Sequence, residues 1–392
     1  MAQRIKVGLI YSYNKDWVAG AYYILNLIHA LKQQPDEEKP ELIILSYSAD
    51  EYKTVKETGY PYLRFVQLNE KDLWASYNLA ERSINKLSRL LFKKNIFYRE
   101  HTQKRLKAQV DVLFPATRHV YFFNIPQRLF WIPDFQEHFL PQFFTEQDLA
   151  DRKKYQSELA AGKASIVFSS NNALQHFKEI YPQSAAATFV LQFAVTHPAY
   201  SHLKINDLEK KFNITQHYFF CPNQFWAHKN HITVLKAIKL LKEQGSRDFI
   251  VAFSGRESDY RNPDFFAGLK KYVADNGIEE QVRFLGFIDR DEQLQLMSHA
   301  ISVIQPSLFE GWSTVVEDAK AMDQFVIASD LPVHREQLAE NVVFFDPHNV
   351  NALAEIMKTM LEKAPQKVKN HYGQQVAAFG KTFVEITKRL RS

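Results

Sequence analysis

Short apolar runs alternate with longer amphipathic segments along almost the whole chain. Runs such as 5–11 and 218–222 have the length and composition of buried strands. Segments such as 20–31 and 350–363 repeat their apolar positions at helical spacing. Strands that alternate with helices predict parallel sheets covered by helices on both faces. A polar stretch at 197–212 interrupts the pattern, so we expect an α/β protein of two facing Rossmann-like domains with a cleft between them.

This interruption sets the expected domain boundaries. We expect a first domain over residues 1–200 and a second over residues 201–372. The last amphipathic segment, 373–392, is long enough to return to the first domain. In open parallel sheets, ligands bind outside the carboxyl ends of the strands. We therefore expect the binding and catalytic residues in the loops that follow the apolar runs.

The most informative loop follows an apolar run late in the chain. Glu310 and Gly311 precede a helix start at Thr314, and Asp318 lies one turn into that helix. Gly311 allows a tight turn or a close approach to a ligand. Thr314 and Glu317 have capping-box spacing, which predicts Thr314 as the N-cap and gives Glu317 a role in folding. A helix start attracts anions, whereas carboxylates beside it are suited to accept hydrogen bonds from sugar hydroxyls.

Composition and charge narrow the class of protein. The chain has 392 residues, of which 46% are hydrophobic and 24% charged, as in ordinary globular proteins. A formal net charge of +5 is too small for a dedicated nucleic-acid binder. The single cysteine, Cys221, excludes an internal disulfide and a zinc site built on several cysteines. The chain lacks a signal-peptide pattern and an apolar stretch of ~18 residues, which predicts a cytoplasmic protein.

Residues 305–321, the signature stretch, resemble the donor-binding motif of retaining family 4 glycosyltransferases, the group 1 enzymes with the GT-B fold. In that motif two Glu residues lie eight positions apart around a turn that contains Gly. Glu310 matches the first Glu, and Asp318 stands in the second place with a shorter side chain. The resemblance implies transfer of a sugar, with retention of configuration, from a nucleoside-diphosphate sugar to a glycan or lipid-linked acceptor. It implies that Glu310 holds donor sugar hydroxyls, that Asp318 holds the ribose, and that no metal or other cofactor is needed. The alternative is that these acids merely favour a helix start.

The same resemblance assigns further donor-binding residues in the second half. Lys229 matches the pyrophosphate-binding Lys in position and in its Lys-Asn context. The companion Arg position is Gln224, and Arg256 is a candidate to replace the missing charge. Phe287 and Ile288 are expected to form the slot for the nucleobase. The remaining candidates for substrate binding lie in the signature stretch: Gly311, Trp312, Ser313 and Thr314.

The first half of the chain carries the resemblance weakly. Gly20 would admit the donor phosphate close to the first domain. Asp134 matches the Asp of a His-Asp pair that lies beside the reacting sugar, but Pro133 stands where the His is expected. His138 is a candidate to occupy the same space, or else an ordinary surface histidine. The catalytic candidates are therefore Glu310, Asp134 and His138.

A long basic segment, 75–107, is expected to form one helix. Either its apolar face packs on the core and its basic face is solvated, or the basic face over 82–107 docks on anionic lipid headgroups at the inner face of the cell membrane. The basic face carries Arg82, Lys86, Arg89 and Lys93, and the opposite face carries Ala80, Ile84, Leu87 and Leu91.

Other classes of function are weaker alternatives. The chain has no G-x-G-x-x-G and no Walker-type loop, so a dinucleotide-dependent dehydrogenase has no motif to support it. Asp289-Arg290-Asp291 has the D-x-D pattern of metal-dependent glycosyltransferases, but it precedes a helix and an N-cap role explains it more simply. A GT-B sugar-nucleotide epimerase stays open, as does an inactive nucleotide-sugar-binding protein, which Gln224 and the displaced His favour.

Overall fold

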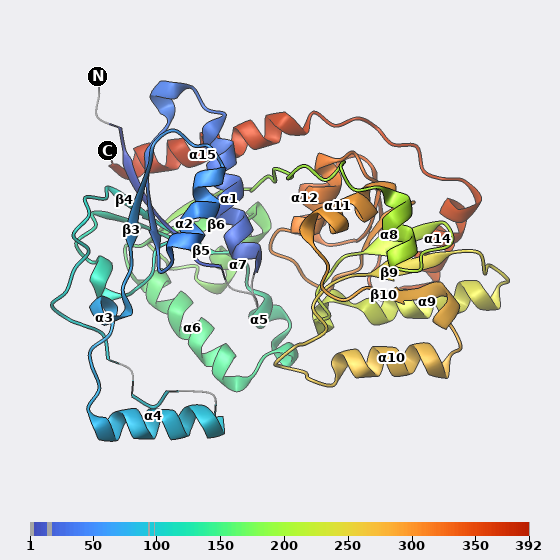
Figure 1. Ribbon diagram of the computed structural model, residues 1–392, viewed down its shortest axis with the longest axis horizontal. Coiled ribbons are helices and arrows are strands. Elements are labelled where there is room, and N and C mark those ends of the chain that lie inside the picture. The colour runs from blue at the N-terminus through green and yellow to red at the C-terminus, as the bar shows by residue number, and fades with distance from the viewer. Residues whose placement is uncertain (1–3, 14–17, 93–94, 98, 392) are drawn as a thin grey trace.

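The computed structural model describes residues 4–13, 18–92, 95–97 and 99–391. It contains two parallel sheets, each flanked by helices (Figure 1). The first sheet is formed by β1 (Lys6–Ile10), β2 (Glu41–Ser46), β3 (Leu63–Gln67), β4 (Val112–Phe114), β5 (Gln127–Ile132), β6 (Ser165–Phe168) and β7 (Ala187–Val190). The second is formed by β8 (Tyr218–Cys221), β9 (Ile250–Phe253), β10 (Val282–Phe284), β11 (Val303–Gln305), β12 (Val326–Ser329) and β13 (Val342–Phe345).

The helices fall into two groups that follow the two sheets. The first domain contains α1 (Val18–Lys32), α2 (Ala49–Glu57), α3 (Glu70–Leu73), α4 (Leu79–Phe92), α5 (Gln136–Phe139), α6 (Glu146–Ala161) and α7 (Asn171–Ile180). The second contains α8 (Ile205–Lys211), α9 (His231–Glu243), α10 (Phe265–Asp275), α11 (Arg290–His299), α12 (Thr314–Ala321), α13 (Pro332–Gln337) and α14 (Val350–Glu362). The last helix is α15 (Tyr372–Arg391).

The strand orders are those of doubly wound Rossmann-like sheets. They run β3-β2-β1-β4-β5-β6-β7 in the first sheet and β10-β9-β8-β11-β12-β13 in the second. Central strands such as β2 are continuous apolar runs because both of their faces are covered: neighbouring Ile43 and Ile44 are both inaccessible to solvent. The predicted fold class is confirmed. The order reverses between β1 and β4 and between β8 and β11, which places a ligand crevice at the carboxyl ends of both pairs.

The last helix returns from the second domain to the first. In Figure 1, α15 lies alongside α1 at the edge of the first domain. The two helices approach closely because Gly380 has no side chain: a Cβ there would lie 2.5 Å from the carbonyl oxygen of Ala30. The amide of Gln34 donates to the carbonyl of Ala377 over 2.9 Å, and Phe383 is fully buried in the first domain's core. The second domain is therefore held between two connections to the first.

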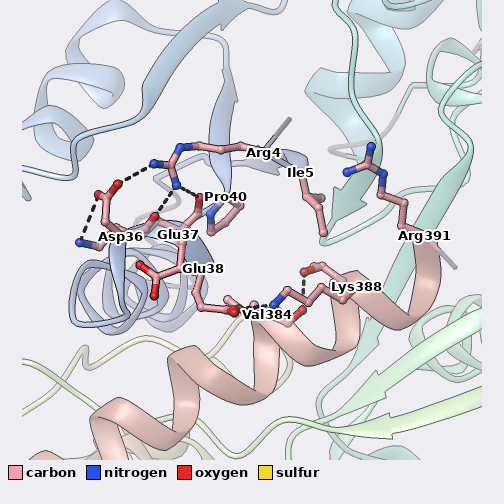
Figure 2. A pocket seen from close by; sticks show the side chains of 11 residues that line it. Arg4, Ile5, Asp36, Glu37, Glu38, Pro40, Val384, Lys388 and Arg391 are labelled. Atoms are coloured by element: carbon pink, nitrogen blue, oxygen red, sulfur yellow. Dashed lines mark hydrogen bonds and ion pairs between the residues drawn. The ribbon is translucent and has the colours of Figure 1, made fainter. Parts of the chain in front are cut away.

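A groove lies between the carboxyl end of α15 and the start of β1 (Figure 2). Its volume is about 640 Å³, and charged pairs close its two sides. Arg4 pairs with Asp36 over 2.6 Å on one side, and Lys388 pairs with Glu38 on the other. Of the two pairs, Lys388 with Glu38 joins the carboxyl end of α15 to the first domain.

Two predictions about the elements were wrong. Residues 75–107 do not form one helix: α4 ends at Phe92, and the chain beyond it is irregular where it is described. The stretch at 197–212, expected to interrupt the pattern of strands and helices, contains the helix α8, whose Leu208 is buried in the second domain's core. Lys93, which was expected on the basic face, lies outside the described residues. Across the described part of the chain, no helix combines the length and apolarity that a bilayer crossing requires.

Candidate active site

The carboxyl ends of β8, β9 and β11 converge where the strand order of the second sheet reverses. The amide of Asn223, just after β8, donates to the side-chain oxygen of Gln305 at the end of β11 over 2.9 Å. Gly255, just after β9, has a φ of +152° and lies directly against the backbone of Asn223, so a Cβ there would collide with the Asn223 carbonyl. These contacts hold the three loops together beneath the crevice.

Lys229 and Glu310 meet in this crevice, although 81 residues separate them in the sequence. The ammonium group of Lys229 lies 2.6 Å from Glu310 Oε1, and Gln305 Nε2 donates to the same oxygen over 2.8 Å. Lys229 ends a short 3-10 turn, and Asn230 after it adopts a left-handed conformation that starts α9. Burial would raise the pKa of Glu310, but the charge of Lys229 outweighs it and holds that pKa below its usual value. Glu310 is thus held as a carboxylate, with Lys229 and Gln305 as the partners of its Oε1 atom.

Three buried histidines stand near this pair: His228, His231 and His334. Burial lowers the pKa of all three, and that of His231 falls to about 3. They are therefore neutral near pH 7. Among these neighbours, Lys229 carries the positive charge that balances Glu310.

The first domain contributes Asp134 to the same place, directly opposite Gly311. A Cβ on Gly311 would lie 2.5 Å from the carbonyl oxygen of Pro133 and 2.8 Å from Asp134 Cβ. Glycine is thus required by the close approach of the two domains. Burial raises the pKa of Asp134, and the nearby charge of Glu310 acts in the same direction. A carboxyl group with a raised pKa beside one with a lowered pKa is a pattern typical of sites that move protons and stabilise charge.

Two cavities meet at Gln224, which lines both. The larger, of about 980 Å³, lies between the domains and contains Asp134 and Arg256. Its first-domain wall includes Trp131, Pro133, Gln136, Arg152 and Tyr155, and its second-domain wall includes Trp226, Glu257, Asp259, Tyr260 and Pro263. The smaller, of about 260 Å³, contains the predicted nucleobase residues Phe287 and Ile288. Both cavities draw residues from both domains.

Asp318 lines the smaller cavity together with Thr314, and its carboxylate is already occupied. Arg290 donates to both of its oxygens, with 2.7 Å from Nη1 to Oδ2, and His197 Nε2 lies 3.1 Å from Oδ1. Burial would raise the pKa of Asp318, yet Arg290 holds it below its usual value. The Arg290 guanidinium lies 5.5 Å from the ring centre of Tyr22, which also lines the cavity. Arg290 therefore places a half-buried guanidinium, paired with Asp318, beside this cavity.

The capping-box prediction was wrong by one residue. Ser313 is the N-cap of α12, and its hydroxyl accepts from the backbone N–H of Val316 over 3.3 Å. Glu317 consequently lies too far into the helix to close a capping box. It is fully buried, accepts from Gln337 Nε2 over 2.8 Å, pairs with Lys320 over 2.8 Å, and accepts from a tyrosine hydroxyl of α15. The backbone N–H of Ser313 is also engaged, by Gln337 Oε1 over 3.1 Å.

Several predicted site residues are not among those that line the two cavities: Gly20, His138, Lys229, Glu310, Gly311, Trp312 and Ser313. Trp312 points into the first domain, where its Nε1 donates to the carbonyl of Phe193 over 3.0 Å. Its position makes it a contact between the domains. His138 is exposed, with its ring centre 5.1 Å from that of Phe139, and it is not among the residues that line either cavity. Gly20 lies buried in the first turn of α1.

Sequence reasoning missed two of the residues that line the smaller cavity, Arg290 and Tyr22. In the sequence, Arg290 is only the middle residue of a D-x-D pattern, and no motif singles out Tyr22. Asp289 is the N-cap of α11, as expected, but its side chain makes no capping hydrogen bond. Among the described residues, no group of three or more His, Cys, Asp or Glu side chains is arranged to hold a metal ion. Arg290 is the first residue of a helix that follows the loop at the end of a strand. This position was the signal that could have identified it.

Comparison with known proteins relates the second half of the chain to one family. Residues 204–377 match the family model described as glycosyl transferases group 1. O-antigen chain mannosyltransferase RfbU of Salmonella typhimurium is 25% identical over 164 residues, which are 42% of this chain and 43% of that protein. The matched region thus spans less than half of that relative.

Solved structures resemble this chain over nearly its full length. A glycosyltransferase from Rickettsia africae has a TM-score of 0.66 at 18% identity and covers 100% of this chain and 99% of its own. Alr3699/HepE of Anabaena, in complex with UDP and glucose, has a TM-score of 0.60 at 14% identity and covers 98% of this chain and 95% of its own. At these identities the likeness concerns the fold, and that fold is the two-domain GT-B architecture.

Proposed function

Because residues 204–377 match the group 1 glycosyl transferases and the whole chain has the GT-B architecture, we propose that this protein transfers a sugar from a nucleoside-diphosphate sugar to a glycan or lipid-linked acceptor. The observation that carries the proposal is the pair formed by Lys229 and Glu310, which lies next to Gly311, where Asp134 of the other domain approaches the chain. A cation and an oriented carboxylate at a strand-order reversal suit a donor that carries phosphates at one end and hydroxyls at the other.

We place the nucleoside in the smaller cavity and the donor sugar in the cleft between Glu310 and Asp134. The exposed ring of Phe287 offers a surface for the base. Gln224, where the two cavities meet, would lie beside the diphosphate. Lys229 would then exchange part of its contact with Glu310 for a phosphate oxygen. This exchange would free Glu310 to accept hydrogen bonds from the sugar hydroxyls.

The proposed reaction breaks the bond between the anomeric carbon and the donor phosphate oxygen. The electron pair leaves with the nucleoside diphosphate, whose developing charge Lys229 and the start of α12 would stabilise. The acceptor oxygen forms the new bond on the face from which the phosphate leaves, which retains the configuration, and its proton passes to the departing phosphate. Glu310 acts by favouring positive charge on the sugar ring, and Asp134 by holding a hydroxyl of that sugar.

We further propose that no metal ion takes part. The role of a cation would be filled by Lys229, with Arg256 beside the larger cavity and Arg290 beside the smaller compensating for the neutral Gln224. Excess EDTA should then leave turnover unchanged. Loss of turnover that magnesium or manganese restores would instead implicate Asp289 and Asp291.

The acceptor is proposed to enter the larger cavity. Its walls contain several aromatic rings, Trp131, Tyr155, Trp226 and Tyr260, and such rings stack against the apolar faces of sugars. The name of the relative RfbU supports a role in building a polysaccharide. We propose that the protein works in the cytoplasm, at the inner face of the cell membrane, where lipid-linked acceptors are exposed.

The test is a panel of UDP-glucose, UDP-galactose and GDP-mannose, each incubated with and without a lipid extract as the source of acceptor. Sugar transfer that requires the extract supports the proposal, and NMR of the product bond reports whether configuration is retained. Conversion of a donor without the extract would indicate an epimerase, and binding without conversion an inactive binding protein. Glu310→Gln is the control for turnover at this site.

A further inference from the structure

Helix α4 is oriented with its polar side toward the protein and its apolar side toward solvent. Glu81, Asn85 and Ser88 are buried, each less than 8% exposed. The amide of Asn85 makes two hydrogen bonds with the backbone of Phe97, at 2.9 and 3.0 Å, and Glu81 pairs with Arg99 over 2.7 Å. The helix is therefore attached through polar contacts to the chain that returns beside it.

The opposite side of α4 is a mainly apolar surface, interrupted by the exposed Ser83, whose hydroxyl donates to the carbonyl of Leu79 over 3.0 Å. Its large side chains are between 42% and 82% exposed: Leu79, Ile84, Leu87, Leu90, Leu91 and Phe92. At 100° per residue, five of these six fall within one sector of about 140°, and Phe92 lies at the helix end. None of the six belongs to the hydrophobic clusters of the two domains. Exposed apolar patches of this kind mark an interaction surface.

A row of positive charge borders the apolar sector on one side. Arg82, Lys86 and Arg89 are all exposed and fall within a sector of about 60° next to Leu79. The acid of this helix, Glu81, faces inward and is paired with Arg99. The solvent-facing side of α4 therefore presents apolar and cationic groups without an acidic one.

Figure 1 shows α4 projecting from the first domain, away from both sheets and from the second domain. The base of this projection is narrow: Trp74 and Glu100 form an isolated antiparallel bridge, and Ala75 N–H donates to the carbonyl of Arg99 over 2.8 Å. The body of the protein therefore does not block a flat surface from reaching the apolar side of the helix.

We propose that α4 is a docking helix for an anionic lipid bilayer, with its apolar side inserted among the acyl chains and Arg82, Lys86 and Arg89 at the headgroups. The combination of an apolar sector with a flanking cationic row is the form that interfacial helices take. A second copy of this chain is a poorer fit, because each α4 would bring its cationic row to the contact and no exposed acid to neutralise the other. The docking does not depend on the donor chemistry, so lipid binding and turnover are measured separately.

The test uses the full-length protein and sedimentation with vesicles of phosphatidylcholine containing 30% phosphatidylglycerol, compared with phosphatidylcholine alone. The apolar variant is Leu87→Gln with Leu90→Gln and Leu91→Gln, all at exposed positions. Its partition into anionic vesicles should fall roughly 100-fold or more, since three leucines no longer leave water. The cationic variant is Arg82→Gln with Lys86→Gln and Arg89→Gln. Its partition should fall roughly 100-fold at low salt, and the difference from the wild type should shrink as salt screens the charges.

A matched control carries Lys53→Gln, Lys56→Gln and Lys71→Gln, which remove three exposed charges from α2 and α3. This variant should bind vesicles nearly as the wild type does. Insertion itself is measured with Leu90→Cys carrying an environment-sensitive fluorophore, which is site-selective because Cys221 is fully buried. Its emission should shift to the blue when anionic vesicles are added.

Two results would overturn the proposal. One is an apolar variant that binds anionic vesicles as tightly as the wild type, or a label at residue 90 that stays in water. The other is a wild-type chain that sediments as a dimer without lipid while the apolar variant is a monomer, which would show that a second copy covers this face.

Discussion

The chain passes between the two domains twice, once on the way to the second domain and once on the way back to α15. A tyrosine at the start of α15 connects both passages to the signature stretch. The hydroxyl of Tyr372 donates to Glu317 Oε2 over 2.5 Å and accepts from the backbone N–H of Val195 over 2.9 Å. Val195 lies on the first passage, Tyr372 on the second, and Glu317 on α12. Tyr372→Phe removes this single oxygen and keeps the ring. We expect it to loosen all three segments at once.

The magnitude follows from the two groups that lose their partner. The N–H of Val195 and the Oε2 atom of Glu317 are both buried and lose this partner, whereas Glu317 Oε1 keeps Gln337 and Lys320. Each buried group left unpaired costs about 1–3 kcal/mol. The free energy of unfolding should therefore fall by about 2–6 kcal/mol. At about 2 °C per kcal/mol for domains of this size, Tm should fall by roughly 4 °C or more.

The matched control is Tyr218→Phe. The hydroxyl of Tyr218 is also buried, but it donates over 2.7 Å to the carbonyl of Leu296 within the second domain. Its loss leaves one group unpaired, so Tm should fall by about half as much or less. Hydrogen exchange separates the two variants further: the amides of α15 should exchange faster in Tyr372→Phe and at the wild-type rate in Tyr218→Phe.

A double-mutant cycle identifies the pair responsible. Glu317→Gln keeps the shape of the side chain but leaves the Tyr372 hydroxyl without its carboxylate acceptor. In the combined variant the two losses should be less than additive, by about 0.5–3 kcal/mol, because both remove the same contact. Additive losses, or unchanged protection of α15 in Tyr372→Phe, would refute the connection described here.

Three further predictions concern the cleft. Lys229→Ala should weaken UDP or GDP binding measured by calorimetry by about 1.5–3 kcal/mol, and unchanged affinity would contradict its phosphate role. Glu310→Gln should lower kcat about tenfold or more with little change in donor KM, whereas Asp318→Asn should raise donor KM more than it lowers kcat, since it releases Arg290. The pKa of Glu310 is lowered by Lys229, so its contribution to stability is complete above its ordinary value of 4.5 and is lost as the pH falls through the lower folded value. The free energy of unfolding of the wild type, measured with urea, should fall as the pH is lowered through that acid range. Glu310→Gln should remove this part of the pH dependence.

The fold and the pairing of Lys229 with Glu310 could be predicted because the sequence patterns of single strands and loops agreed with the tertiary structure. The apolar runs of the central strands are long and uninterrupted because their faces are covered on both sides. Lys229 and Glu310 each follow such a strand, and adjacent parallel strands end at the same edge of the sheet. Their meeting therefore follows from the order of β8 and β11.

The remaining features depend on contacts that the sequence does not specify. The faces of α4 were identified correctly, but a periodic pattern does not tell which face packs, and here the polar contacts of Asn85 and Glu81 decide it. Glu317 looked like a capping residue because its true partner, Tyr372, is 55 residues away. Arg290 was overlooked because its partner, Asp318, lies on another helix, α12.

The contact at Gly311 has a consequence for the motion of the two domains. The carbonyl of Pro133 touches the chain of the second domain where no side chain intervenes, so this contact cannot be relieved by a change of rotamer. It sets the smallest separation that the two domains can reach. In the donor site that we propose between Glu310 and Asp134, this separation would limit the size of the sugar. The methyl group added by Gly311→Ala would hold the two domains further apart. We expect it to shorten the lifetime of bound nucleotide although it changes no group that touches the nucleotide.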